Sequence, residues 1–203
     1  MAIHPTAVVE TKDIGEGVEV GPFTWIGPNV QLEDGVRIGA HCSIGGDPEH
    51  KSRIGNGFIT IGLDSTLHDR VTVSTPTDGY TIISRNCYIM TGAHIAHDCD
   101  LGEGVTLSAG VVLGGHVVIQ PCANLGMNVC VHQRVKIGAA SMVGAGSVVL
   151  YDVPCAVKVA GVPCRQIGSN TSGIDRLDEV GLGSNLDSYS KELLTNSGRL
   201  RKP

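Results

Sequence analysis

An aliphatic residue recurs at every sixth position through most of the chain, and this period limits the fold more than any other feature. The twelve positions six apart from Ile83 to Val149 all carry Ile, Leu or Val. Small or β-branched residues fill most positions four further along, and Gly often follows the aliphatic residue. This pattern is typical of a hexapeptide-repeat β-helix, in which short strands stack into a solenoid. The sequence therefore predicts an all-β fold.

The same period extends to the N-terminus, where its positions are Val8, Ile14, Val20, Ile26, Leu32, Ile38 and Ile44. We expect one solenoid over residues 1–162, followed by a short, weakly helical C-terminal tail over residues 163–203. The 28 Gly and the 3% aromatic content agree with tight turns between short flat strands. No second layered domain is needed.

The period is interrupted twice, at residues 45–53 and at residues 74–82. The first segment follows Ile44 and is too long and polar for a turn, and the second separates Val73 from Ile83. Both are predicted to be loops that project from the coil. Insertions in solenoids cluster on one face and often build the binding surface.

Charge and cysteine content exclude several classes of partner. The net charge is −5 and no Lys/Arg-rich block occurs, so nucleic acid and anionic membranes are poor partners. No apolar run approaches the ~20 residues of a membrane span, and no secretory signal pattern opens the chain. Seven Cys is an odd number for a disulfide framework, and Cys42, Cys87 and Cys99 fall on small inward positions. We expect reduced thiols and a cytoplasmic protein.

Three hexapeptides make one triangular coil, so residues about eighteen apart lie one above another. The hexads that start at Ile95, Leu113 and Val131 share a face and carry His97, His116 and His132. The second loop falls on this face one coil below. Spacing alone leaves an active site and a solvated corner as equal alternatives. The four other imidazoles outside this segment are expected to have structural or solvated roles: His4, His41, His50 and His68.

Four segments carry a resemblance to a known family. They are Ala93-His94-Ile95-Ala96-His97-Asp98-Cys99, Gly114-Gly115-His116-Val117, Val131-His132-Gln133 and Ile3-His4-Pro5-Thr6-Ala7. Together they resemble the UDP-N-acetylglucosamine O-acyltransferases that begin lipid A synthesis, in register from residue 3 to about residue 153. The resemblance implies a left-handed parallel β-helix and a homotrimer with active sites in clefts between subunits.

The implied chemistry is acyl transfer from an acyl-carrier-protein thioester to a hydroxyl of a UDP-amino sugar, with no bound cofactor and no metal. A hydroxyl needs a general base near neutral pH, and the resemblance assigns that role to His97. Asp98 is similar to the family's orienting carboxylate. Gly115 matches the family's backbone N–H donor to the oxyanion of the tetrahedral intermediate.

The resemblance also assigns substrate contacts. His94, His116, His132 and Gln133 match substrate-positioning residues, while Asn170 and Arg176 fall where the family contacts the nucleotide. Ala145 matches the residue at the far end of the acyl-chain groove, where a side chain limits the chain length.

Departures from the family leave alternatives open. Only about forty residues follow Pro163, where the family has a larger helical domain, and Ser172 and Leu177 replace an acidic and a basic nucleotide contact. The segment Val159–Arg165 resembles the exit motif of coenzyme A-dependent hexapeptide sugar acetyltransferases, so acyl-coenzyme A and O- or N-acylation remain alternatives. A gamma carbonic anhydrase-like zinc protein would need two His five apart, but Gly92 stands five before His97. A non-catalytic scaffold is the fourth possibility.

Overall fold

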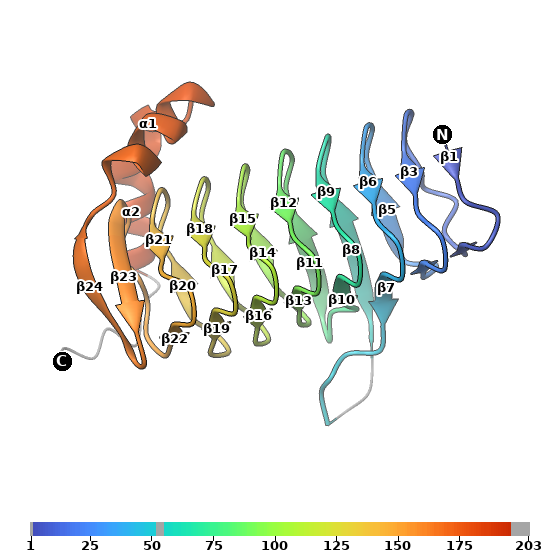
Figure 1. Cartoon of the computed structure of the whole chain (residues 1–203), viewed down its shortest axis with the longest axis horizontal. Coiled ribbons are helices and arrows are strands. Elements are labelled where there is room, and N and C mark those ends of the chain that lie inside the picture. Colours follow the sequence, from blue (N-terminus) through green and yellow to red (C-terminus); the bar gives the residue numbers. More distant parts are fainter. Residues whose placement is uncertain (1, 52–54, 196–203) are drawn as a thin grey trace.

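The structure is a computed structural model that describes residues 2–51 and 55–195. Residues 52–53 of the first predicted loop and residues 196–203 of the predicted tail lie outside the described residues. The chain forms the predicted hexapeptide-repeat parallel β-helix (Figure 1). Three sheets run along the solenoid, and we name them sheet A, sheet B and sheet C.

The three sheets take their strands in turn from successive sides of each coil. Sheet A contains β1 (Ala2–Ile3), β3 (Glu19–Val20), β6 (Arg37–Ile38), β9 (Thr66–Leu67), β12 (Tyr88–Ile89), β15 (Thr106–Leu107), β18 (Asn124–Leu125), β21 (Met142–Val143), β23 (Val157–Gly161) and β24 (Cys164–Ser169). Sheet B contains β2 (Val8–Val9), β4 (Trp25–Ile26), β7 (Ser43–Gly46), β10 (Thr72–Ser74), β13 (His94–Ile95), β16 (Val112–Leu113), β19 (Cys130–Val131) and β22 (Val148–Val149). Sheet C contains β5 (Val30–Leu32), β8 (Gly57–Ile61), β11 (Gly79–Ile83), β14 (Asp100–Leu101), β17 (Val118–Ile119) and β20 (Lys136–Ile137).

The aliphatic residue of each hexad points into the prism and stacks on its equivalent in the next coil. Ile95 pairs with Leu113, and Leu113 pairs with Val131, in parallel register. Ile95 and Leu113 are fully buried. Burial of one such side chain is worth about 1.5–3 kcal/mol, so the repeated ladders provide the core without aromatic residues.

The first coil departs from the predicted register. Val8 was expected on the inward period, but it is 55% exposed, and its neighbour Val9 pairs with the buried Ile26. Val9 lies six residues after Ile3, which pairs with Val20. Ile14 comes only five positions after Val9, so the first coil is one residue short. The six-residue period counted backward from Ile14 therefore falls on Val8 instead of Val9.

Both insertions leave the solenoid between sheet B and sheet C. The β7–β8 loop spans residues 47–56, and its described residues 47–51 project away from the coil (Figure 1). The β10–β11 loop covers only residues 75–78. The expected range of 74–82 was too long, because residues 79–82 belong to β11 and pair with β8 from Gly79↔Gly57 onward. Likewise Gly45 and Gly46, expected in the first loop, end strand β7.

The C-terminal segment contains the two helical pieces that were expected and, before them, a strand that was not. Strand β24 pairs antiparallel with β23, so sheet A continues beyond the expected boundary at residue 162 to Ser169. Helix α1 (Thr171–Glu179), the 3₁₀ turn η1 (Gly183–Asn185) and helix α2 (Leu186–Thr195) follow. Leu177 is fully buried against Cys122 and Ala140 of the coil. Neither helix has the length and apolar character that crossing a membrane requires, within the described residues.

Three corners join the sheets. The B/C corner contains the turns from sheet B to sheet C and both insertions. The C/A corner contains the turns from sheet C to sheet A, and the A/B corner those from sheet A to sheet B. Helices α1 and α2 pack at the C-terminal end of the prism, and the β7–β8 loop lies toward the N-terminal end (Figure 1).

Candidate active site

Successive turns at the B/C corner bring three of the predicted residues together. His97 and Asp98 lie between β13 and β14, and His116 lies between β16 and β17, one coil further on. Asp98 and His116 have positive φ values of 59°. Asp and His tolerate this left-handed conformation better than most residues, so the turn position suits both. The repeat therefore stacks His116 on Asp98.

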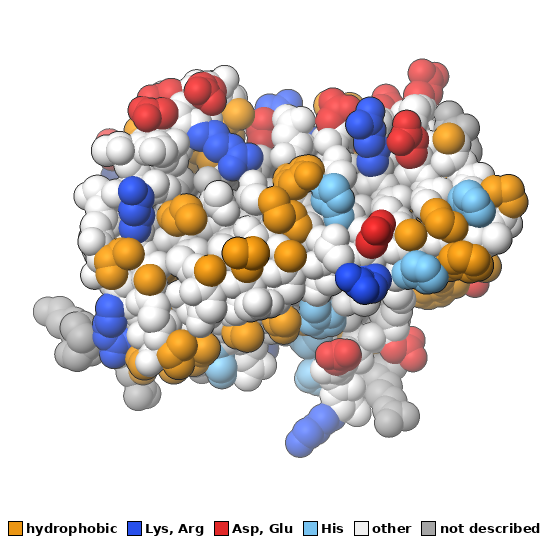
Figure 2. All heavy atoms as spheres, in the orientation of Figure 1, with side chains coloured by type: hydrophobic (Ala, Val, Ile, Leu, Met, Phe, Trp, Pro, Cys, Tyr) orange, Lys and Arg blue, Asp and Glu red, His pale blue; other side chains and the backbone are white. Residues whose placement is uncertain are grey.

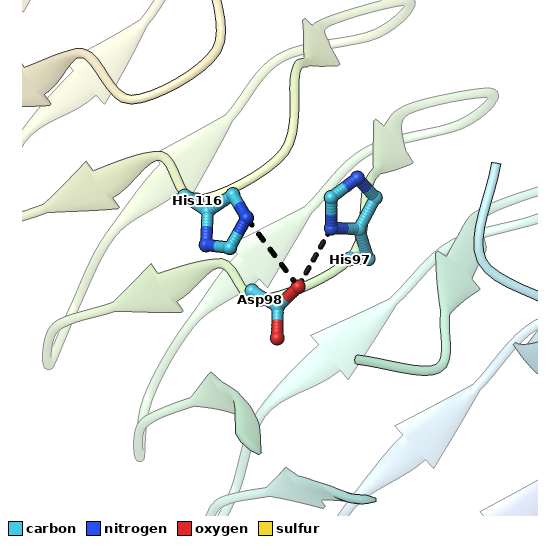
Figure 3. Close-up of side chains that lie close together, drawn as sticks. All are labelled: His97, Asp98 and His116. Atoms are coloured by element: carbon cyan, nitrogen blue, oxygen red, sulfur yellow. Dashed lines mark hydrogen bonds and ion pairs between the residues drawn. The ribbon is translucent and has the colours of Figure 1, made fainter. Parts of the chain in front are cut away.

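The imidazole of His97 is bonded to the carboxylate of Asp98 (Figure 3). Nδ1 lies 2.7 Å from Oδ2, and the two side chains are 9% and 6% exposed. An ionised carboxylate only accepts hydrogen bonds, so Nδ1 carries a proton, and in the neutral ring the lone pair is on Nε2. A neutral imidazole in this tautomer is a general base.

The β10–β11 loop holds the other side of Asp98. The Thr77 hydroxyl donates to Oδ2 at 2.6 Å and its backbone N–H donates at 3.1 Å, while the Asp78 N–H donates to Oδ1 at 3.2 Å. Burial alone would raise the pKa of Asp98, but the hydrogen bonds from Thr77, His97 and the loop amides lower it to about 2. Asp98 is therefore ionised at neutral pH.

The absence of a side chain at Gly115 leaves room for the imidazole of His97. A Cβ on this residue would lie 2.6 Å from Nε2 and 3.1 Å from Nδ1 of His97. No side chain can stand there without moving the imidazole. The backbone of Gly115 thus lies directly against the ring.

His116 completes the cluster. Its ring lies edge-on to that of His97, with centroids 5.1 Å apart, and its Nε2 is 3.7 Å from Oδ2 of Asp98. Burial lowers the pKa of His116, although the Asp98 carboxylate acts in the opposite direction. His116 is a neutral hydrogen-bonding group near neutral pH.

The β7–β8 loop folds back over the same corner. His50, expected to be a solvated or structural residue, is exposed, and its ring lies 5.4 Å from that of His97, nearly edge-on. Glu49 lies 3.8 Å from Nε2 of His94, whose Nδ1 is 2.8 Å from the Thr72 hydroxyl. Histidine side chains gather where this loop leaves the coil (Figure 2).

His132 and Gln133 follow on the next coil of the same corner. Both are exposed, and the Gln133 backbone lies against Gly114. Among the described residues, ring contacts join His50, His97 and His116 and do not extend to His132.

The three remaining predicted residues lie at other corners. Asn170 is buried and donates from Nδ2 to the Ala140 carbonyl at 2.8 Å. Arg176 donates to the Gly104 carbonyl at 2.8 Å, at the C/A corner. Ala145 is exposed at the A/B corner, between β21 and β22. Within one protomer, none of the three joins the His97 cluster.

Sequence reasoning missed Thr77 and His50. The hexapeptide period placed the second loop on the face of His97, one coil below, and this was a usable signal that a loop residue reaches Asp98. Nothing comparable pointed to His50, because the position of a long loop off the coil does not follow from the period.

The cluster has some features of a cation site. His97, Asp98 and His116 each offer an atom within 4.8 Å of the others. However, Oδ2 of Asp98 already accepts three donors, from Thr77 and His97. A cation on this oxygen would have to displace them, so the geometry fits an acid–base pair better than a metal centre.

Comparison with known proteins identifies the family. The bacterial transferase hexapeptide (six repeats) family model matches residues 17–47 and 80–115. An acyl-[acyl-carrier-protein]–UDP-N-acetylglucosamine O-acyltransferase from Syntrophobacter fumaroxidans is 39% identical over 202 residues, covering 88% of this chain and 78% of that protein. The corresponding protein from Paraburkholderia phymatum is 35% identical over 197 residues, covering 86% of this chain and 75% of that protein.

Solved structures agree. A UDP-N-acetylglucosamine acyltransferase from Campylobacter jejuni matches with a TM-score of 0.76 and 25% identity, covering 98% of this chain and 92% of the other. A UDP-N-acetylglucosamine O-acyltransferase from Moraxella catarrhalis matches with a TM-score of 0.68 and 27% identity, covering 100% and 88%. The chain therefore belongs to the acyl-[acyl-carrier-protein]–UDP-N-acetylglucosamine O-acyltransferase family.

Proposed function

We propose that this protein transfers an acyl group from an acyl-carrier-protein thioester to a hydroxyl of UDP-N-acetylglucosamine. The observation that carries the proposal is the 2.7 Å hydrogen bond between His97 and Asp98 in a buried corner, in a chain of this family. The pair supplies a neutral imidazole whose Nε2 is available, next to a fixed negative charge.

The reaction proceeds through a tetrahedral intermediate. Nε2 of His97 takes the proton of the sugar hydroxyl while the hydroxyl oxygen attacks the thioester carbon. The carbonyl electron pair moves to oxygen, and the N–H of Gly115 donates a hydrogen bond to this oxyanion. Collapse re-forms the carbonyl and breaks the C–S bond, and the sulfur leaves with the proton from His97. Asp98 stabilises the imidazolium between the two proton transfers, and the chemistry requires no bound cofactor.

The outer face of sheet B offers a path for the acyl chain. Val112, Cys130 and Val148 point outward on consecutive strands, and Val112 is 42% exposed. His97 follows β13 at one edge of this sheet, and Ala145 precedes β22 at the opposite edge. Three strand spacings separate the two strands, or about 14 Å along the solenoid. An apolar strip of this kind would guide a chain from the base toward Ala145.

A homotrimer completes the proposed site. Asn170 and Arg176 lie at the C/A corner of their own chain, whereas His97 lies at the B/C corner. Only a neighbouring subunit can bring the two corners together around one nucleotide sugar. His94, His116, His132 and Gln133 would contact the sugar from the His97 side.

The proposal includes a cytoplasmic location. All seven cysteines are free thiols, which suits a reducing compartment. Burial raises the pKa of Cys87 and Cys99 to about 12, so both remain protonated inside the coil.

The direct test supplies the purified protein with UDP-N-acetylglucosamine and a panel of acyl-carrier-protein and acyl-coenzyme A thioesters. Free thiol release and mass of the sugar product report turnover and the position of the acyl group. Transfer from acyl carrier protein to a hydroxyl supports the proposal. Turnover with coenzyme A donors alone, or no transfer, would contradict it.

A further inference from the structure

We propose that Thr77 is a positioning residue that fixes the Asp98 carboxylate and so sets the basicity of His97. This inference rests on the proposed function for its kinetic consequences. Thr77 acts through the Asp98 carboxylate, to which both Thr77 and His97 are hydrogen-bonded.

The contacts are concentrated on one oxygen. Oδ2 of Asp98 accepts the Thr77 hydroxyl at 2.6 Å, the Thr77 amide at 3.1 Å and Nδ1 of His97 at 2.7 Å. The backbone N–H of Asp98 donates to the Thr81 hydroxyl at 3.0 Å. The carboxylate therefore cannot rotate without breaking several bonds, and its oxygen is held on the ring of His97.

The loop that carries Thr77 is itself anchored. The Thr75 amide donates to the Gly46 carbonyl at 2.8 Å, and the Thr75 hydroxyl donates to the Gly45 carbonyl at 2.9 Å. The Asn56 amide donates to the Pro76 carbonyl at 3.1 Å. These bonds tie the β10–β11 loop to both ends of the β7–β8 loop, so Thr77 is presented from a fixed backbone.

The hydroxyl of Thr77 also determines the negative charge density on Oδ2, the oxygen that accepts from His97. A donor at 2.6 Å withdraws electron density from the oxygen, and this competes with the His97 N–H. Other titratable groups near the pair are Asp78 on the same loop as Thr77, His116, which faces Oδ2 from the next coil, and His50, whose ring lies against that of His97. Arg134 adds positive charge beside His116. None of these donates the short bond that Thr77 makes.

Thr77→Val removes the hydroxyl and keeps the shape of the side chain. We expect kcat to fall by about 10- to 100-fold with little change in KM, as is usual when a group that orients a reactive side chain is lost. The acid limb of the pH profile of kcat/KM should move to higher pH, because the His97–Asp98 pair then holds its proton more tightly. Thr77→Ser should restore both. The matched control is Thr66→Val, which removes a hydroxyl on β9 in sheet A, away from Asp98 and from both loops.

A second readout does not depend on turnover. The carboxyl carbon of ¹³C-labelled Asp98 should begin to titrate at a higher pH in Thr77→Val than in the wild type, and Thr66→Val should match the wild type. If the titration of Asp98 moves to higher pH in Thr77→Val but the wild type transfers no acyl group, the proposed function is wrong and the positioning role of Thr77 is still supported. If neither the titration nor the pH profile separates Thr77→Val from Thr66→Val, Thr77 is a structural loop residue and the inference is wrong.

Discussion

The imidazole of His97 lies on the backbone of Gly115, at the position a Cβ of residue 115 would occupy. That Cβ would be 2.6 Å from Nε2 of His97. Gly115→Ala should therefore push the ring off Asp98 and reduce kcat by at least about tenfold, while the coil stays folded. The backbone conformation is no obstacle, because Gly115 is not among the residues with positive φ. Steady-state kinetics and a crystal structure of the variant would check the displacement.

Gly168→Ala is the matched control for this variant. A Cβ at Gly168 meets no atom within 4 Å, so activity and melting temperature should stay close to the wild type. Full activity in Gly115→Ala would show that the base does not lie where the structure places it.

Substitutions of His97 and of Asp98 should lower kcat by different amounts. His97→Ala should lower kcat by about 10²–10⁴, the usual contribution of a general base, and leave the circular dichroism spectrum unchanged. Asp98→Ala should cost less, because Asp98 orients the base and stabilises its charge without meeting the substrate. Values of kcat measured for both variants at saturating acyl donor would show which substitution costs more activity. An active His97→Ala protein would refute the assignment.

The sequence predicted the coil well because one physical requirement repeats in every hexad. The inward ladder at Ile95, Leu113 and Val131 follows directly from the period, and the same period brought His97 and His116 to one corner. It failed at Val8, because a single missing residue in the first coil shifts the register and leaves no local trace. The period also says nothing about segments that leave the coil, so the position of His50 over His97 could not be predicted.

Asp98 should make stability depend on pH in acid. Its pKa is about 2 in the folded protein, below the ordinary value of 3.8, so the stabilisation is fully present above about pH 4 and is lost as the pH falls toward 2. The shift corresponds to about 2 kcal/mol. Asp98→Asn should flatten this part of the curve. Urea unfolding at pH 6, 4 and 3 would measure it, and parallel curves for the two proteins would contradict the shift.

Mixed assemblies can test whether a site is shared between subunits. His97→Ala lacks the base, and Arg176→Ala lacks the guanidinium predicted to reach a neighbour's nucleotide. Each homotrimer should have low activity, but co-refolded mixtures contain interfaces with both residues intact and should regain part of it. Sedimentation should report trimers for all three samples. Monomers, or mixtures no more active than the average of their parents, would place the whole site within one chain.

Ala145 should limit the length of the acyl group. It lies at the A/B corner, beyond the outward residues Val112, Cys130 and Val148 that follow one another from the strand of the base. Each carbon added at this point must displace about one methylene of the substrate, or it incurs an overpacking cost of ~1–3 kcal/mol. Ala145→Gly should then shift the preference toward longer donors, and Ala145→Met toward shorter ones. Neither change touches the His97 cluster, so each variant should keep a wild-type rate with its own best donor. Competition assays with a series of acyl-carrier-protein thioesters would compare the three proteins. Superimposable chain-length profiles would mean that the acyl chain does not run along sheet B to this corner.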